Sequence, residues 1–253
     1  MDYSEQVRQR KHRGRAIAKA GSIEEALEAG TIPQCYDQAW GRELLTQPAA
    51  IKAAVDWTRK NEVVCFYDAG DVQANGFQIA EDDKLGRSFT DTGASYIGFA
   101  VSSLLVTAMT SEPSYGLALS GDGSFVMNPQ ILIDGVQHGA CGCIIVFDNR
   151  RMAAISGLQN AQYGAEYATS DQVEVDYVAW AKAIKGVAGL HGGYSTEELT
   201  QALDMAYKHK GLSLIHVPVY CGADELGGMG AFGRWNVGNW CEDVQALRHK
   251  IGL

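Results

Sequence analysis

The sequence predicts a doubly wound α/β fold, in which a mainly parallel sheet carries helices on both faces. Two observations lead to this fold class. Short apolar segments recur along the chain and alternate with segments of helical periodicity. The composition is globular, with 46% hydrophobic and 20% charged residues. At the usual ~150 residues per domain, the 253 residues leave room for one large domain or two small ones.

The first part of the chain precedes the expected sheet. We expect residues 1–45 to form a helical N-terminal arm, because most of this segment is charged and rich in alanine. A basic cluster at positions 8–15 fits a solvated helix and a partner-docking helix about equally. Residues 46–60 have helical periodicity and lead into an expected strand over 63–67.

Strands and helices alternate from there on. An expected strand over 117–120 ends in a Gly-Asp-Gly turn. Asn128 and Pro129 have the pattern of a helix N-cap and first helical residue, and Gly139 ends that helix. A continuous apolar strand over 143–147 follows.

The last regular elements complete the predicted sheet. Ser195 and Glu198 form a capping box that opens a helix ending near Gly211, and a strand over 214–217 comes directly after it. Apolar strands separated by helices indicate a parallel sheet that is covered on both faces. We therefore assign residues 46–220 to the α/β domain.

The C-terminal segment, residues 221–253, is rich in glycine and tryptophan. So many glycines disfavour a core helix or strand. A flap that closes over a ligand and an extension that follows the surface are both open interpretations.

Composition excludes several function classes. The net charge of −9 disfavours binding to a nucleic-acid backbone. The longest apolar run, residues 97–110, is shorter than the ~20 residues of a membrane span, and the first thirty residues lack a signal-peptide pattern. We expect a soluble, cytoplasmic protein. The six cysteines include no C-x-x-C pair, so we expect reduced thiols rather than zinc or iron–sulfur ligands.

Two polar loops carry the candidate chemistry. The first loop contains Gly121, Asp122, Gly123 and Ser124, and the second contains Asp148, Asn149, Arg150 and Arg151. One helix and one return strand separate the loops, which is the length of a parallel crossover. Because parallel strands end at the same edge of a sheet, the two loops should lie close together.

The residue types in these loops suit a magnesium ion and a diphosphate. Asp122 would supply a carboxylate oxygen, Asn149 an amide oxygen and Arg151 a backbone carbonyl, all of them ligands that Mg²⁺ prefers. Gly121 and Gly123 let backbone N–H groups approach phosphate oxygens closely. Gly-Asp-Gly taken alone is more often a simple turn.

The spacing of the two loops makes the pattern more specific. A Gly-Asp-Gly followed by 25 residues and then Asn149 resembles the signature of thiamine-diphosphate-dependent enzymes. Upstream, residues 93–98 resemble the family segment in which a bulky side chain, here Ile97, props the bound cofactor. The resemblance implies that the carbonyl of Ser95 binds the aminopyrimidine, and that the cofactors are thiamine diphosphate and Mg²⁺.

Downstream segments narrow the resemblance. Residues 154–159 and 164–167 look like the trihydroxycyclohexanedione hydrolase and acetolactate synthase group, and Trp235 and Val237 are similar to the C-terminal end of that group. The resemblance runs from about residue 50 to the C-terminus. Asp148 stands where many relatives have a second asparagine, which we expect to leave metal binding unchanged.

Two departures from the family affect the expected function. Arg150 and Arg151 replace smaller residues, so their side chains either face the site and favour an anionic substrate or point to solvent. Full-length members carry a separate pyrimidine-binding domain with the catalytic glutamate, whereas the cofactor domain fills nearly all of this chain. The resemblance therefore implies a partner chain that supplies the glutamate, in a homo- or hetero-oligomer.

The expected function is that of a cofactor-binding subunit. The enzyme would cleave or form C–C bonds next to a carbonyl, acting on a 2-oxo acid or a 1,2-dicarbonyl compound as a decarboxylase, hydrolase or acyltransferase. One alternative is the β subunit of a 2-oxoacid:ferredoxin oxidoreductase, which would need iron–sulfur ligands. Another is a non-catalytic subunit that stabilises a partner.

Overall fold

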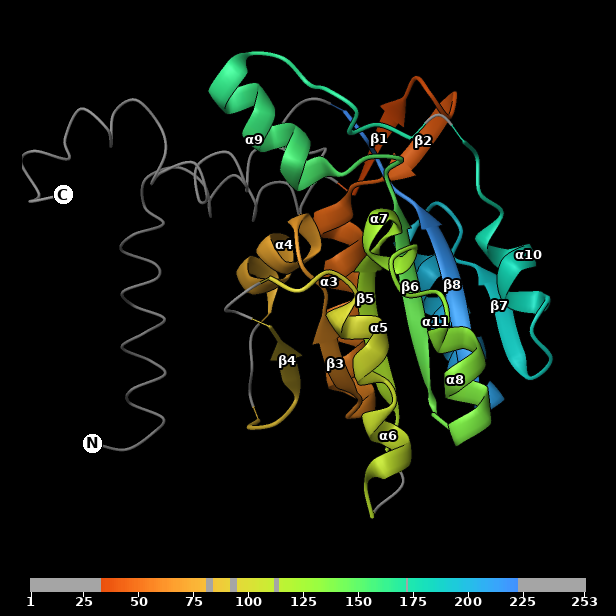
Figure 1. Cartoon of the computed structure of the whole chain (residues 1–253). Coiled ribbons are helices and arrows are strands. Elements are labelled where there is room, and N and C mark those ends of the chain that lie inside the picture. Colours follow the sequence, from red (N-terminus) through yellow and green to blue (C-terminus); the bar gives the residue numbers. More distant parts are fainter. Residues whose placement is uncertain (1–32, 81–83, 92–94, 112–113, 172, 223–253) are drawn as a thin grey trace, which may run out of the picture.

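The computed structural model describes residues 33–80, 84–91, 95–111, 114–171 and 173–222 (Figure 1). The expected arm therefore falls outside the described residues up to position 32, and the expected flap falls outside them from position 223. In the described ranges we find no helix whose length and apolarity would let it span a bilayer.

Six parallel strands form the central sheet, in the spatial order β4-β3-β5-β6-β8-β7. The strands are β3 (Val64–Tyr67), β4 (Ser88–Thr90), β5 (Gly116–Gly121), β6 (Gly142–Asp148), β7 (Val187–His191) and β8 (Leu212–Pro218). The predicted α/β fold class is confirmed, and the predicted apolar strands are all present with slightly different ends.

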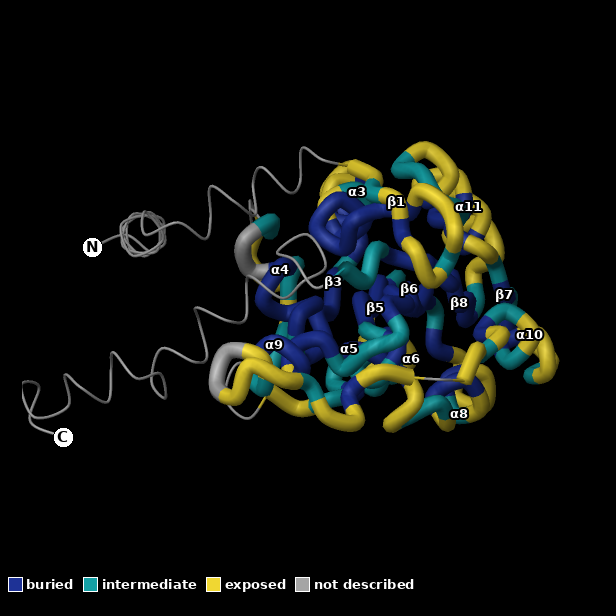
Figure 2. The backbone as a smooth tube through the Cα atoms, turned by 90° about the horizontal axis from the view of Figure 1, so that it is seen from above, coloured by how far each residue is buried: buried dark blue, intermediate teal, exposed yellow. Residues whose placement is uncertain are grey.

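The strands are buried on both faces, which explains why they read as continuous apolar runs. Cys143, Ile145 and Phe147 of β6 belong to one hydrophobic cluster, while Ile144 and Val146 belong to the other. Successive side chains of a strand point to opposite faces, so β6 contributes to both cores. Figure 2 shows the strands buried in the middle of the molecule and the exposed segments around them.

Helices cover both faces of the sheet. One face packs against α3, α4 and α11, and the other against α5, α8 and α10. The helices are α3 (Gln47–Asn61), α4 (Asp71–Ile79), α5 (Phe99–Ser103), α6 (Val106–Met109), α7 (Asp122–Phe125), α8 (Ile131–His138), α9 (Ala153–Tyr163), α10 (Tyr177–Lys182) and α11 (Thr196–His209). The two covered faces are those of a doubly wound sheet.

The ends of α11 follow local chemistry. The side chain of Ser195 accepts a hydrogen bond from the N–H of Glu198, and the Glu198 side chain accepts one from the N–H of Ser195, so the predicted capping box is confirmed. At the other end, Lys210 adopts the left-handed conformation with φ 52°. The predicted end near Gly211 is therefore correct in place, but Lys210 makes the turn.

Two local predictions are wrong. Helix α8 begins at Ile131, not at Pro129, and the side chain of Asn128 donates to Ser102 instead of capping the helix. The described end of the expected helical arm is a hairpin of β1 (Gln34–Asp37) and β2 (Arg42–Leu45). An Asx turn explains the hairpin, because Asp37 accepts the N–H groups of its own turn.

The strand order creates a switch point that locates the site. Strand β3 has β4 on one side and β5 on the other. The chain therefore runs from β3 outward to β4 and then returns across β3 to β5, so the direction of winding reverses next to β3. Ligands of open α/β sheets bind beyond the carboxyl ends of the strands at such a point. Helices α7 and α9 lie at this end of the molecule together with the β1–β2 hairpin (Figure 1).

Candidate functional site

A cavity of about 250 Å³ lies at the switch point. Segments that follow β3, β4, β5 and β6 line it, together with the first residues of α9. Seven of the residues singled out in the sequence line this cavity: Ser95, Ile97, Gly121, Asp122, Gly123, Ser124 and Arg151. The chain thus brings together residues from three connections in one hollow.

Asp122 is the first residue of α7 and is only 3% exposed. Its Oδ1 accepts the N–H of Gly123 at 2.7 Å, whereas its Oδ2 is buried without a hydrogen-bond partner. Burial, followed by the negative charge of Asp148, raises the pKa of Asp122 well above its usual value. A buried carboxylate oxygen without a donor is rare and calls for a ligand.

Asp148 ends β6 and lies beside Asp122 at the same sheet edge, because Gly121 pairs with Phe147 in register. Its Oδ2 lies 2.8 Å from Nε2 of His216. Burial would raise the pKa of Asp148, but the hydrogen bond and charge of His216 outweigh burial and lower it. The negative charge of Asp148 acts on Asp122 and raises the pKa of that neighbour.

Asn149 is 4% exposed and is held by its neighbours. Its Nδ2 donates to Asp71 Oδ2 at 3.1 Å, and its Oδ1 accepts the N–H of Arg151 at 3.2 Å. Asp71 also lines the cavity. The predicted pair of Asp122 and Asn149 thus follows adjacent strands. Asp122 lines the cavity, whereas Asn149 does not line it but contacts Asp71, which does.

The loop after β6 is clamped by the segment before α10. Met152 donates to the carbonyl of Thr169, and Asp171 donates to the carbonyl of Arg150, both at 2.8 Å. These two bonds flank Arg151, whose own N–H and carbonyl consequently point away from Ser170. The carbonyl of Arg151 is thereby left on the side that faces Asn149.

The two arginine side chains behave differently. The Arg151 side chain lines the cavity and is 16% exposed, and its Nε lies 3.9 Å from Glu166. The guanidinium of Arg150 instead lies 4.0 Å over the ring of Trp40 and 3.7 Å from Glu174. Of the two, Arg151 is the one placed to meet a bound molecule.

The described residues fit a hard cation with oxygen ligands. Asp122 offers a buried oxygen that lacks a donor, and Asn149 and Arg151 offer an amide and a carbonyl oxygen. Magnesium accepts such a mixed set together with phosphate oxygens. This set contains a single carboxylate, and within the described ranges no cluster of three or more His, Cys, Asp and Glu side chains offers a different kind of metal site.

Sequence reasoning missed two acidic residues that follow β3. Asp68 is buried and accepts the N–H of Gly98 at 2.8 Å and the hydroxyl of Ser120 at 3.0 Å, so it joins β3, β5 and α5. Asp71 stands at the start of α4. Burial raises the pKa of both carboxyl groups. Their position directly after an apolar strand was the signal that could have found them.

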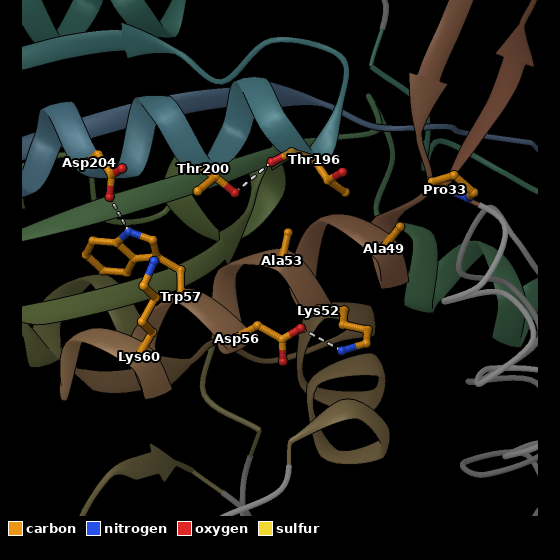
Figure 3. A pocket seen from close by; sticks show the side chains of 10 residues that line it. All are labelled: Pro33, Ala49, Lys52, Ala53, Asp56, Trp57, Lys60, Thr196, Thr200 and Asp204. Carbon is orange, nitrogen blue, oxygen red and sulfur yellow. Dashed lines mark hydrogen bonds and ion pairs between the residues drawn. The ribbon is translucent and has the colours of Figure 1, made fainter.

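A second hollow lies between α3 and α11, with a volume of about 430 Å³ (Figure 3). Its polar groups are largely paired with one another. Trp57 Nε1 donates to Asp204 at 2.8 Å, and Lys52 pairs with Asp56 at 2.6 Å. We therefore place the candidate site at the cavity next to Asp122.

The fold and cavity define an α/β domain with a cavity at the switch point of its parallel sheet. Residues 68–217 match the family described as "Thiamine pyrophosphate enzyme, C-terminal TPP binding domain". This match covers more than half of the chain, and the chain belongs to that family of thiamine-diphosphate-binding domains. The family expected from the sequence is confirmed.

Curated relatives are considerably longer than the matched region. The 3D-(3,5/4)-trihydroxycyclohexane-1,2-dione hydrolase of Halalkalibacterium halodurans is 30% identical over 151 residues, which are 58% of this chain and 23% of the relative. The enzyme of the same name from Shouchella clausii is 27% identical over 191 residues, covering 73% of this chain and 29% of the relative. The chain thus spans less than a third of either relative.

A solved structure supports the fold. The benzoylformate decarboxylase from Polynucleobacter necessarius superposes with a TM-score of 0.62 at 21% identity. The superposition covers 71% of this chain and 34% of the decarboxylase. The likeness shows that the two proteins share this fold.

Proposed function

We propose that this chain is the cofactor-binding subunit of a thiamine-diphosphate-dependent enzyme that cleaves or forms C–C bonds next to a carbonyl. The substrate is a 2-oxo acid or a 1,2-dicarbonyl compound. The pyrimidine-binding domain and the catalytic glutamate come from a partner chain. The reaction is a decarboxylation, a hydrolysis or an acyl transfer.

The unpartnered Oδ2 of Asp122 is the observation that carries the proposal. The oxygen is buried at the edge of the sheet where Asn149 and Arg151 present further oxygens. A bound cation would replace the missing donor and offset the repulsion between Asp122 and Asp148. A magnesium ion that carries a diphosphate meets both needs.

Each of the site residues expected from the sequence then has a defined task. Asp122, Asn149 and the carbonyl of Arg151 would hold Mg²⁺, and Gly121, Gly123 and Ser124 would face the diphosphate. Ile97, which is half-buried in the cavity wall, would support the cofactor from below, and the carbonyl of Ser95 would receive its aminopyrimidine group. When bound, thiamine diphosphate supplies the electron sink for breaking a bond next to a carbonyl.

The backbone of Ser95 adopts the left-handed conformation. Its φ of 54° is unusual for a residue with a side chain. Its hydroxyl lies 3.3 Å from Gln73 Oε1, and Gln73 also donates to the carbonyl of Asp91 at 2.7 Å. Strain of this kind is found at sites where the surrounding structure fixes an active conformation.

The coverage of the relatives supports a partner chain. The family domain occupies residues 68–217, and the aligned regions amount to 23% and 29% of the two hydrolases. The remaining domains of such an enzyme would have to come from outside the described residues. We infer an oligomer in which the cofactor lies between this chain and a pyrimidine-domain chain.

The cysteines weigh against a 2-oxoacid:ferredoxin oxidoreductase subunit. None of the five described cysteines forms a disulfide, and in the described part of the chain no group of three or more His, Cys, Asp and Glu side chains could hold a metal ion. The intact oxygen set around Asp122 weighs against a subunit that only stabilises a partner. Both alternatives remain outcomes of the following experiment.

The test is purification of the protein with its associated chains, followed by an assay against 2-oxo acids and 1,2-diketones. We expect a co-purifying chain with a pyrimidine-type domain, and turnover that requires thiamine diphosphate and Mg²⁺. Turnover should be lost in Asp122→Ala and kept in the matched control Asp56→Ala, whose carboxylate lies on the exposed face of α3. Full activity in Asp122→Ala, or an iron–sulfur absorption spectrum, would contradict the proposal.

A further inference from the structure

The amide of Asn149 can face the metal with its oxygen only if its nitrogen is held elsewhere. Oxygen and nitrogen of an amide have nearly the same shape, so neighbours decide the orientation. Asp71 Oδ2 lies 3.1 Å from Nδ2 of Asn149, and an ionised carboxylate can only accept. The nitrogen is therefore turned to Asp71 and the oxygen to the opposite side.

The oxygen of Asn149 keeps capacity for a cation in this orientation. The N–H of Arg151 reaches Oδ1 at 3.2 Å and occupies one of its two lone pairs. The other lone pair is open on the same side of the amide. Asp71 thus decides whether a ligand oxygen or an N–H group is presented there.

Asp71 is itself fixed by a buried network. Gln47 Nε2 donates to Asp71 Oδ2 at 2.8 Å, and Gln47 Oε1 accepts from Asn75 at 2.6 Å. The N–H of Val72 reaches Asp71 Oδ1 at 3.0 Å. Gln47 and Asn75 are 1% and 2% exposed, so water does not compete for these bonds. The network joins α3 and α4 to the loop after β6.

We propose that Asp71 is a positioning residue for the metal, which acts by orienting Asn149 and by adding negative charge beside the ion. This inference rests on the proposed function. It assigns a role to a residue outside the Gly-Asp-Gly and Asn pattern. Partners that orient a metal ligand commonly change metal affinity by about 10- to 100-fold when they are removed.

The direct test is calorimetric titration of Mg²⁺ into the purified protein at saturating thiamine diphosphate, with any co-purifying chain retained. Asp71→Asn keeps the shape of the side chain. An amide cannot serve all three N–H donors that Asp71 accepts, because its own NH₂ must face at least one of them. We expect Mg²⁺ affinity to fall about 10- to 100-fold in Asp71→Asn. Asp56→Asn, a control on the surface of α3, should leave it unchanged.

A rescue variant separates positioning from a merely structural role. In Asp71→Asn combined with Asn149→Asp, residue 149 presents a carboxylate oxygen in either orientation and the net charge is restored. We expect Mg²⁺ affinity to return to within about tenfold of wild type. Gln47→Met, which removes one donor to Asp71, should give a smaller loss of about 2- to 5-fold and serves if Asp71→Asn does not fold.

The outcomes distinguish the positioning role from the proposed function. If folded Asp71→Asn binds Mg²⁺ within twofold of wild type while Asp122→Ala does not bind, the positioning role is wrong and the proposed function stands. If the wild-type protein binds no Mg²⁺ with thiamine diphosphate, both fail. A loss in Asp71→Asn with no recovery in the double variant also overturns the positioning role.

Discussion

Asp122 and Asp148 occupy equivalent places on neighbouring strands yet have opposite surroundings. Both follow or end a buried strand at the carboxyl edge of the sheet, and they are 3% and 4% exposed. His216 and the N–H of Arg150 satisfy Asp148, and its pKa is lowered. Asp122 keeps one oxygen without a partner, and its pKa is raised. One carboxylate is completed by the fold, and the other is left for a ligand.

The contrast shows how one sheet edge serves stability and binding at once. A buried charge that is paired and hydrogen-bonded stabilises the arrangement it sits in, while an unpaired one weakens it. Natural proteins keep an unpaired buried group where function requires it. The two aspartates should therefore respond to substitution in opposite ways.

The largest effect is expected for the completed carboxylate. Asp148→Ala should lower the free energy of unfolding by about 3–5 kcal/mol, because it leaves His216 buried without its partner. Urea denaturation measures the change. His216→Ala should cost a similar amount, and the double variant should cost much less than the sum of the two. Additive losses would show that the pair does not act as a unit.

The glycine next to Asp122 comes second. A Cβ at Gly123 would overlap with Sδ of Met152, so Gly123→Ala must displace that side chain. We expect a loss of about 1–3 kcal/mol in unfolding free energy, measured by thermal denaturation. Met152→Ala in the same chain should recover part of the loss. No recovery would place the cause in the backbone of the turn.

The open carboxylate should behave in the opposite sense to Asp148. Asp122→Asn, in protein free of cofactor and metal, should raise the free energy of unfolding by about 1–2 kcal/mol, because the amide removes the negative charge that burial and Asp148 disfavour. Urea denaturation with and without Mg²⁺ and thiamine diphosphate provides the measurement. A loss as large as that of Asp148→Ala would remove the contrast between the two residues.

The smallest effect concerns Asp37, a satisfied carboxylate in the hairpin. Burial would raise its pKa, but N–H groups of Cys221, Trp40 and Ala39 outweigh burial and lower it. A lowered pKa gives stability that is present above the unfolded value of about 3.9 and is lost as pH falls below it. Relative to Asp37→Asn, wild type should lose about 1 kcal/mol between pH 5 and pH 2. Parallel pH curves would argue against these bonds.

The parts of the fold that the sequence predicted share a strong local pattern. The apolar runs of β5 and β6 are buried on both faces, and the capping box of α11 is a short motif with its own chemistry. The start of α8 was mispredicted, because Asn128 has a tertiary partner in Ser102 that competes with capping. The β1–β2 hairpin was missed, because its turn depends on Asp37 and on Cys221 far along the chain.

The candidate site also contains residues that a sequence pattern predicts and contacts that depend on the tertiary structure. Asp122 and Asn149 could be predicted, because one crossover between adjacent strands brings them to the same edge. The contact between Asp71 and Gln47 could not, because it joins two residues 24 positions apart on different helices and follows no motif. The different positions of the Arg150 and Arg151 side chains could not be predicted either, because they depend on contacts with Trp40 and Glu166 that only the folded chain provides.

The proposed function requires that Asp122 and its neighbours bind a diphosphate together with Mg²⁺. Isothermal titration of thiamine diphosphate with Mg²⁺ into the wild-type protein and into Asp122→Ala tests it most directly. We expect saturable binding that requires Mg²⁺ and that weakens at least about 100-fold in the variant, a difference of about 2.7 kcal/mol. Equal affinity in the two proteins would contradict it.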